Sequence, residues 1–213
     1  SGERAEDGDY ALNDLGELRR NPFHTSRDVE GFTNRDIWST TVLLRHEGRN
    51  VAFTSATGYV SWATNDLTDL DYSPMPLMTR TSAEEDRQFT QELRLASAAP
   101  PPSQRPKQVA LTWQMGMFYF TQEYTQDAVN SFSPYVLSPQ VPFPVDQHSP
   151  LSALDDEGIG VYGQGTVTFG NAFDLSAGVR FDRERKTAKL ETFYDPAIAP
   201  PTLVDTERTY SDV

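Results

Sequence analysis

The most regular pattern in the chain is a strict alternation of apolar and polar residues from position 173 to position 182. Apolar residues occupy every second position from Phe173 to Phe181, and Asp, Ser, Gly and Arg residues lie between them. Because successive side chains of a β-strand point to opposite faces, this spacing predicts a strand with one apolar and one polar face. Residues 159–169 alternate in the same way, and Gly170-Asn171 between the two runs tolerate the positive φ of a tight turn. We therefore predict a β-hairpin.

Four further segments show the same period of two. The alternation from Val109 to Tyr119 lies in a predicted strand, 107–122, that is longer than most strands of water-soluble proteins. Residues 88–96 also alternate, and residues 36–46 and 51–63 predict two more strands joined by a short polar turn at 47–50. We predict six strands, with a possible seventh that begins near Glu207. Residues 1–32 are polar and are predicted to form a loop that could include a short strand.

The predicted connections fall into two classes that alternate along the chain. Residues 47–50 and 170–172 are short connections and 97–106 is intermediate, whereas 64–86, 123–157 and 187–206 are long and rich in Pro, Asp and Ser. Strands of about 11 residues tilted by about 45° span roughly 25 Å, the height of the apolar band of an outer-membrane barrel. The pattern predicts an all-β chain with a long-stranded antiparallel sheet that has one polar and one apolar face, and it places the long loops in water.

Three stretches carry a family resemblance: FTQELRLAS at 89–97, WQMGMFYFTQEY at 113–124 and YGQGTVTFGNAFDLSAGVRFDRERK at 162–186. In this order they resemble the barrel of TonB-dependent receptors, and especially large proteobacterial groups of that family. The resemblance covers residues 86–186 firmly and residues 33–63 loosely.

The resemblance implies a 22-stranded barrel in the bacterial outer membrane, with a plug domain inside it and a segment that engages the TonB complex with ExbB and ExbD. It also implies active uptake of a scarce nutrient, such as a ferric siderophore, cobalamin or a glycan, by a barrel surrounded by outer-membrane lipid. Six or seven strands are too few for such a barrel, and no plug is recognisable. With this resemblance, we expect residues 1–213 to be an antiparallel transmembrane β-barrel segment with its long loops outside the cell. This partial barrel would be a fragment of the receptor or one piece of a split protein.

The polar faces of the predicted strands supply the candidate functional residues. We expect them to line the lumen of the barrel: Glu92, Arg94, Gln114, Arg180 and Asp182. The alternation also predicts which side chains face lipid: Leu111, Trp113, Met115, Leu175, Ala177 and Val179. The side chains predicted to face the lumen or plug are Gln114, Gly116, Ser176 and Arg180.

Other chemistry finds little support in the sequence. The chain has no Cys, its three His residues lie far apart, and its net charge of -13 argues against nucleic acid as a partner. Carboxylates on the polar faces could form the catalytic pair of a glycosidase. A simpler explanation is that these charged groups line a lumen and pair with one another or with the plug. Calcium could be bound by Asp66, Asp69 and Asp71, or by Asp155, Asp156 and Glu157, but neither group has the EF-hand spacing. We predict no enzyme activity, no cofactor and no metal.

Two other functions remain open from the sequence. A passive, porin-like barrel would have no plug domain in its gene. A soluble β-rich binding module, such as a β-sandwich, would stay in the aqueous fraction without detergent.

Overall fold

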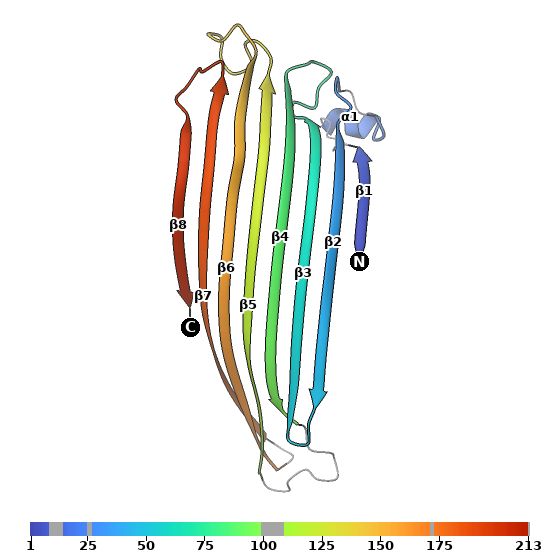
Figure 1. Cartoon of the computed structure of the whole chain (residues 1–213). Coiled ribbons are helices and arrows are strands. Elements are labelled where there is room, and N and C mark those ends of the chain that lie inside the picture. The colour runs from blue at the N-terminus through green and yellow to red at the C-terminus, as the bar shows by residue number, and fades with distance from the viewer. Residues whose placement is uncertain (9–14, 25–26, 99–108, 171–172, 213) are drawn as a thin grey trace.

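A computed structural model describes residues 1–8, 15–24, 27–98, 109–170 and 173–212 and shows one antiparallel sheet of eight strands (Figure 1). The strands lie side by side in sequence order, so that every strand pairs with its neighbours in the chain. β1 and β8 form the two edges, and the sheet is open between them. The strands are β1 (Gly2–Gly8), β2 (Phe32–Glu47), β3 (Val51–Asp69), β4 (Met78–Ser97), β5 (Val109–Phe132), β6 (Val145–Phe169), β7 (Phe173–Asp195) and β8 (Thr202–Asp212), and a short helix, α1 (Leu15–Arg20), follows β1.

The connections separate to the two ends of the sheet, as the sequence predicts. Residues 48–50 turn the chain at the lower end in Figure 1, where β6 also ends at Phe169 and β7 begins at Phe173. Residues 70–77, 133–144 and 196–201 connect strands at the upper end. In the first turn the Gly48 amide donates to the Val51 carbonyl over 2.9 Å. Gly170 has a φ of 60°, the conformation expected of a tight turn, which confirms the predicted hairpin of β6 and β7. Asn171 and most of the connection at 97–106 lie outside the described residues.

The strands are much longer than the sequence pattern predicts. β5, β6 and β7 contain 24, 25 and 23 residues. Most residues of the three segments predicted as long loops belong to strands: β3 and β4 in 64–86, β5 and β6 in 123–157, and β7 and β8 in 187–206. The strand count also rises from six or seven to eight, because Gly2–Gly8 pairs with β2 and β8 begins at Thr202 rather than near Glu207. Polar side chains occur on both faces of the upper part, as at Asp155, Asp156 and Glu157, so the backbone pairing continues there without a regular apolar period.

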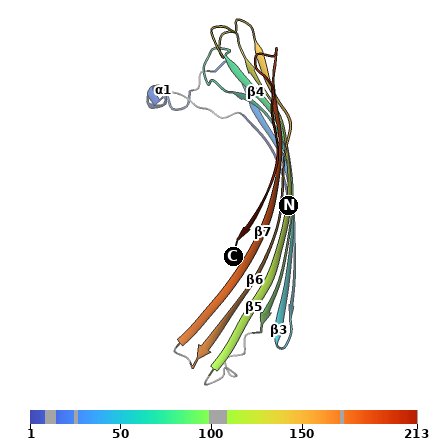
Figure 2. The same ribbon diagram turned by 90° about the vertical axis from the view of Figure 1, so that its left-hand side faces the viewer.

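The sheet curves, and its two faces differ in chemistry. Figure 2 shows the sheet edge-on, with α1 on its concave side. The register places Leu111, Met115 and Val179 on one face and Gln114 and Arg180 on the other, as predicted. The large apolar residues that are exposed on the first face form what we call the apolar band: Val42, Leu44, Leu95, Leu111, Met115, Met117, Ile159, Val161, Leu175, Val179 and Phe181.

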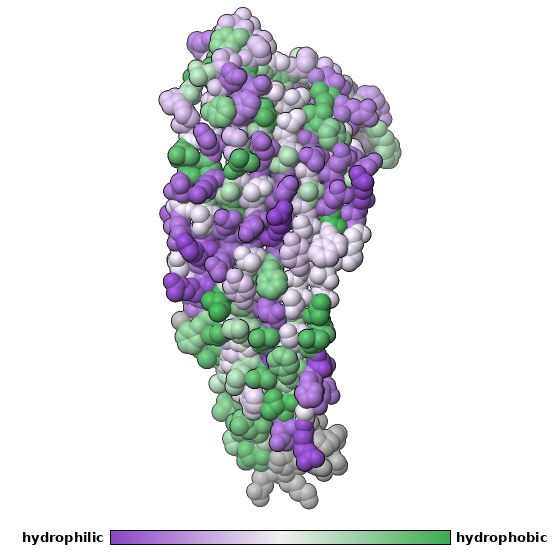
Figure 3. Space-filling model, viewed as in Figure 1, coloured by the Kyte–Doolittle hydropathy of each residue, from purple (hydrophilic) through white to green (hydrophobic). Residues whose placement is uncertain are grey.

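The apolar band occupies only part of the convex face. Figure 3 shows the sheet from this side, with apolar residues gathered in the lower half and polar residues in the upper half. Among the described residues, Ala128 and Val145 alone are buried apolar residues, so the sheet has almost no core of its own. An exposed apolar surface of this extent requires another apolar environment, either lipid or a protein partner.

A search of the described residues for membrane-crossing helices finds none of sufficient length and apolar character.

Candidate functional site

The five candidate residues lie together on the polar face. Residues that pair across antiparallel strands project to the same side, so the register forms rows that cross the sheet. Glu92 pairs with Phe118, and this row continues through Gly160 to Asp182. Arg94 and Arg180 share the neighbouring row, and Gln114 lies in the row after that. The face that they share is the concave one.

Four of the five candidate residues make hydrogen bonds, either with each other or with Tyr162 or Gln164. The Tyr162 hydroxyl donates to Glu92 Oε1 over 2.8 Å. Arg180 donates twice to the Asp182 carboxylate, with distances of 2.7 and 2.8 Å, and Gln114 Nε2 donates to Gln164 Oε1 over 3.2 Å. These contacts lie on the lower concave face, where Glu92, Arg180 and Asp182 each have a hydrogen-bond partner within the sheet.

A hollow of about 730 Å³, which we call the upper hollow, lies higher on the concave face. Trp62, Asp86 and Tyr124 belong to one register row, and Gln122, Asp156, Lys186 and Arg208 belong to the next. The concave-face side chains that define it are Trp62, Asp86, Gln122, Tyr124, Leu154, Asp156, Lys186, Ala188, Thr206, Arg208 and Tyr210.

Direct contacts fix the polar groups of the upper hollow. Gln122 Nε2 donates to Asp86 Oδ2 over 2.6 Å, and Asp86 is only 3% exposed. Lys186 Nζ lies 2.8 Å from a carboxylate oxygen of Asp156 and 2.8 Å from one of Glu184. A buried carboxylate that keeps its hydrogen bonds is held in one orientation, so the hollow has a defined polar surface.

A second hollow of about 520 Å³, the side hollow, adjoins the first and shares Trp62 with it. Its walls are rich in hydroxyl groups and in charges of both signs. Gln126 Nε2 donates to Glu84 Oε1 over 2.7 Å, which repeats the amide–carboxylate pair of the upper hollow. The side hollow is lined by Thr33, Arg35, Ile37, Trp62, Thr64, Asp66, Thr68, Arg80, Ser82 and Glu84.

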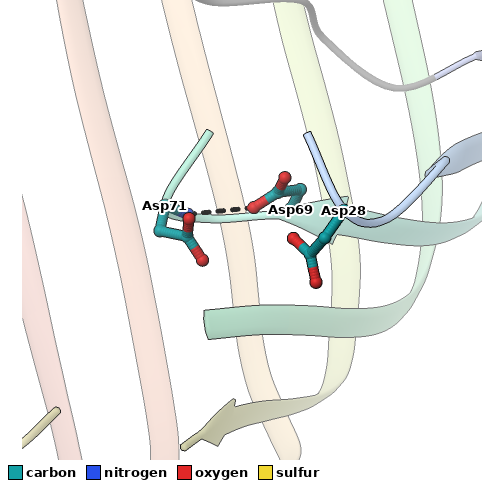
Figure 4. A group of neighbouring side chains, drawn as sticks. All are labelled: Asp28, Asp69 and Asp71. Atoms are coloured by element: carbon teal, nitrogen blue, oxygen red, sulfur yellow. Dashed lines mark hydrogen bonds between the residues drawn. The ribbon is translucent and has the colours of Figure 1, made fainter. Parts of the chain in front are cut away.

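Three carboxylates gather at the upper rim, where Asp28, Asp69 and Asp71 have oxygen atoms within 4.8 Å of one another (Figure 4). Hydrogen bonds from backbone amides hold two of these carboxylates, since Asp69 Oδ1 accepts the amides of Asp71 and Tyr72. Asp71 accepts the amides of Ser73, Leu77 and Met78, which closes the loop 70–77. Partial burial opposes ionisation of Asp71, but hydrogen bonds from the Ser73 hydroxyl and these amides hold its pKa below the usual value.

Neither acidic group proposed from the sequence comes together as a set of three. Asp66 does not join Asp69 and Asp71, because it lies within β3 and lines the side hollow, whereas Asp69 is the last residue of β3 and Asp71 lies in the loop after it. Asp155 and Glu157 project to the convex face and Asp156 to the concave face, since neighbouring residues of a strand alternate.

The sequence did not indicate the two hollows, although it marked Asp66 and Asp156 of their linings as possible calcium ligands. Trp62 lay at the end of a predicted strand, and Asp86, Tyr124 and Asp156 lay in or beside segments that were predicted as loops. The period of two does continue through Trp62, Thr64, Asp66 and Thr68, all of which line the side hollow. This alternation was the sequence signal that could have indicated that β3 continues along the side hollow.

Comparisons with known proteins agree with this architecture. Residues 2–212 match the family described as TonB dependent receptor-like, beta-barrel. Among solved structures, the ferric yersiniabactin uptake receptor FyuA from Yersinia pestis superposes with a TM-score of 0.66 and 13% sequence identity over 86% of this chain. The aligned part is 25% of the FyuA chain, so this chain spans about a quarter of that receptor, and at such an identity the likeness concerns the fold alone. No curated protein matches the chain.

Proposed function

Because the chain belongs to the TonB-dependent receptor-like β-barrel family, we propose that its sheet is part of the barrel wall of an outer-membrane receptor that takes up a scarce nutrient. The family match over residues 2–212 is the observation that carries this proposal. The two-faced sheet supports it independently. In this arrangement the convex apolar band contacts lipid, and the concave face, with Glu92, Arg94, Gln114, Arg180 and Asp182, lines the lumen.

The lengths of the strands give the wall a membrane part and an outer part. β5 has 24 residues, which at about 3.3 Å per residue and a tilt of about 45° rise on the order of 55 Å. The apolar band of a membrane barrel is only about 25 Å tall. The upper half of the sheet, with both hollows and the connections 70–77 and 133–144, therefore projects outward from the cell, where it meets the nutrient first.

Uptake is proposed to be active. TonB, with ExbB and ExbD, would supply the energy through a part of the receptor other than this wall, and transport itself needs no catalytic residue. The concave face would act by binding the nutrient and releasing it when the lumen is opened.

The test compares three strains of the source bacterium: the wild type, one that lacks this gene and one that lacks tonB. Uptake of labelled ferric siderophores, cobalamin and oligosaccharides is measured in each strain at growth-limiting concentrations. We expect at least one compound whose uptake is lost equally in both mutants. Uptake that requires this gene but continues without tonB would show a passive pore instead.

A further inference from the structure

Trp62 has an unusual position on the concave face, since it borders both hollows. Its ring centroid lies 6.0 Å from that of Tyr124, and Tyr210 lines the same upper hollow. Aromatic rings present flat apolar surfaces that pack against other flat apolar surfaces. The C–H faces of sugar rings are such surfaces, and they stack on indole and phenol rings.

The polar side chains around these rings can both donate hydrogen bonds to and accept them from the hydroxyl groups of a ligand. The Gln122–Asp86 and Gln126–Glu84 pairs each hold a planar amide beside a planar carboxylate, and the amide has a second N–H and a carbonyl oxygen besides the N–H that contacts the carboxylate. Asp156 Oδ1 is buried and accepts no hydrogen bond from the described residues. A hydroxyl group both donates and accepts, so neighbouring hydroxyls of a sugar match planar side chains that offer both functions.

The charges that line the two hollows on the concave face are balanced. Two carboxylates and two bases of the concave face line the upper hollow: Asp86, Asp156, Lys186 and Arg208. Asp155 also borders the hollow, but its side chain projects to the convex face. The side hollow adds two of each sign: Asp66, Glu84, Arg35 and Arg80. Lys186 is also flanked by Asp156 and Glu184, which reduces its attraction for an anion. An anionic ferric chelate would require an excess of positive charge, whereas a neutral ligand would not.

We propose that the two hollows bind a neutral oligosaccharide, with Trp62 as the stacking platform between two sugar subsites. The volumes of about 730 and 520 Å³ lie within the range of ligand sites in proteins. This inference rests on the proposed function, because it names the class of nutrient that the receptor carries.

The experiment uses the full-length receptor, purified in an amine-oxide detergent, because alkyl glycoside detergents would compete for a sugar site. Maltohexaose, cellohexaose and xylohexaose are titrated by calorimetry, together with an anionic ferric catecholate chelate. We expect one or more of the oligosaccharides to bind and the chelate not to bind. Trp62→Ala should weaken oligosaccharide binding by about tenfold or more, because it removes the stacking surface of both subsites.

Trp38→Ala is the matched control, since Trp38 lies on the neighbouring strand and is exposed on the convex face. Binding should change less than about twofold in this variant. Binding of the chelate alone, binding of no oligosaccharide, or equal oligosaccharide affinity in wild type and Trp62→Ala would overturn the inference. The wild-type titration tests the class of nutrient even if a variant does not assemble, and the comparison of Trp62→Ala with Trp38→Ala locates the site.

The two proposals can fail separately. Oligosaccharide binding together with uptake that is independent of TonB would support the sugar site and contradict energised transport. TonB-dependent uptake of another nutrient, with no oligosaccharide bound, would support energised transport and contradict the sugar site.

Discussion

At the scale of single residues, glycines on the concave face make room for their cross-strand partners. Gly116 pairs with Tyr162, and a Cβ at Gly116 would lie 2.5 Å from the Tyr162 hydroxyl oxygen. Gly158 pairs with Phe120, whose ring would contact a Cβ there in the same way. The glycine thus allows the ring to lie flat over the sheet, where Tyr162 reaches Glu92.

Gly116→Ala should therefore destabilise the assembled protein by about 1–3 kcal/mol, because the methyl group displaces the Tyr162 ring and breaks its bond to Glu92. The measurement is the denaturant midpoint of the full-length receptor in detergent. Gly163→Ala is the control, since nothing lies within 4 Å of a Cβ at that position. Equal midpoints for the two variants would contradict the proposed packing of Tyr162.

Asp71 organises the upper loop 70–77, and its contribution should depend on pH. Asp71→Ala should lower stability by about 1–2 kcal/mol at neutral pH, because several amide donors lose their acceptor. The folded-state pKa of Asp71 lies below its usual value of 3.8, so its stabilisation is present above pH 4 and is lost as the pH falls through the folded pKa.

The measurement compares denaturant unfolding of wild type and Asp71→Ala at pH 7 and at pH values below 4. The difference between the two proteins should shrink as the pH falls. A difference that stays constant would show that the Asp71 charge does not hold the loop.

At the scale of the elements, sequence periodicity predicts a strand well only where one face is apolar. The alternation from Phe173 to Asp182 and the turn at Gly170 gave the β6–β7 hairpin and its two faces correctly. It gave the length of neither strand, because Asp155, Asp156 and Glu157 of β6 are all acidic although they project to alternate faces. A strand with polar residues on both faces has the same sequence pattern as a loop. Only its backbone pairing with neighbouring strands distinguishes such a strand from a loop.

The hollows could not be predicted for the same reason. They form where rows from several strands meet, and Trp62, Tyr124 and Lys186 are far apart in the sequence. Register between strands brings such residues together. The register puts the candidates on one face, as alternation could indicate because they lie within clearly alternating segments: Glu92, Arg94, Gln114, Arg180 and Asp182. That this face lines a lumen stays a prediction.

β7 offers a direct test of its two faces. Val179 is 51% exposed within the apolar band, whereas Ser176 lies on the concave face and its hydroxyl is 2.8 Å from that of Thr166. Val179→Arg should destabilise the barrel by about 2–4 kcal/mol near the membrane midplane, and Ser176→Arg should cost less because a polar lumen can hydrate the charge.

Refolding of both variants into vesicles of short-chain and long-chain lipids separates a lipid contact from a protein contact. The penalty at position 179 should fall in thinner bilayers, where the guanidinium reaches the interface. A penalty that is independent of the lipid would mean that Val179 packs against protein.

At the scale of the whole molecule, the two ends of the sheet should lie on opposite sides of the outer membrane. Gln140 is exposed in the connection 133–144 and Arg49 is exposed in the turn 48–50. The 213 residues contain no Cys, so single cysteines introduced here can be labelled selectively.

In intact cells, Gln140→Cys should react with a maleimide polymer too large to pass through porins, and Arg49→Cys should react only after the outer membrane is opened. The unsubstituted receptor controls for cysteines elsewhere in the protein. The reverse pattern would invert the proposed orientation.

The central claim is that the convex face contacts lipid while the concave face lines a lumen. Spin labels on single cysteines at positions 175–181 of β7, in the full-length receptor reconstituted in vesicles, test this claim most directly. Accessibility to oxygen, which concentrates in lipid, should peak at 175, 177, 179 and 181 and be low at 176, 178 and 180, because these positions alternate between the faces. Oxygen accessibility that does not alternate, or that peaks at 176, 178 and 180, would contradict it.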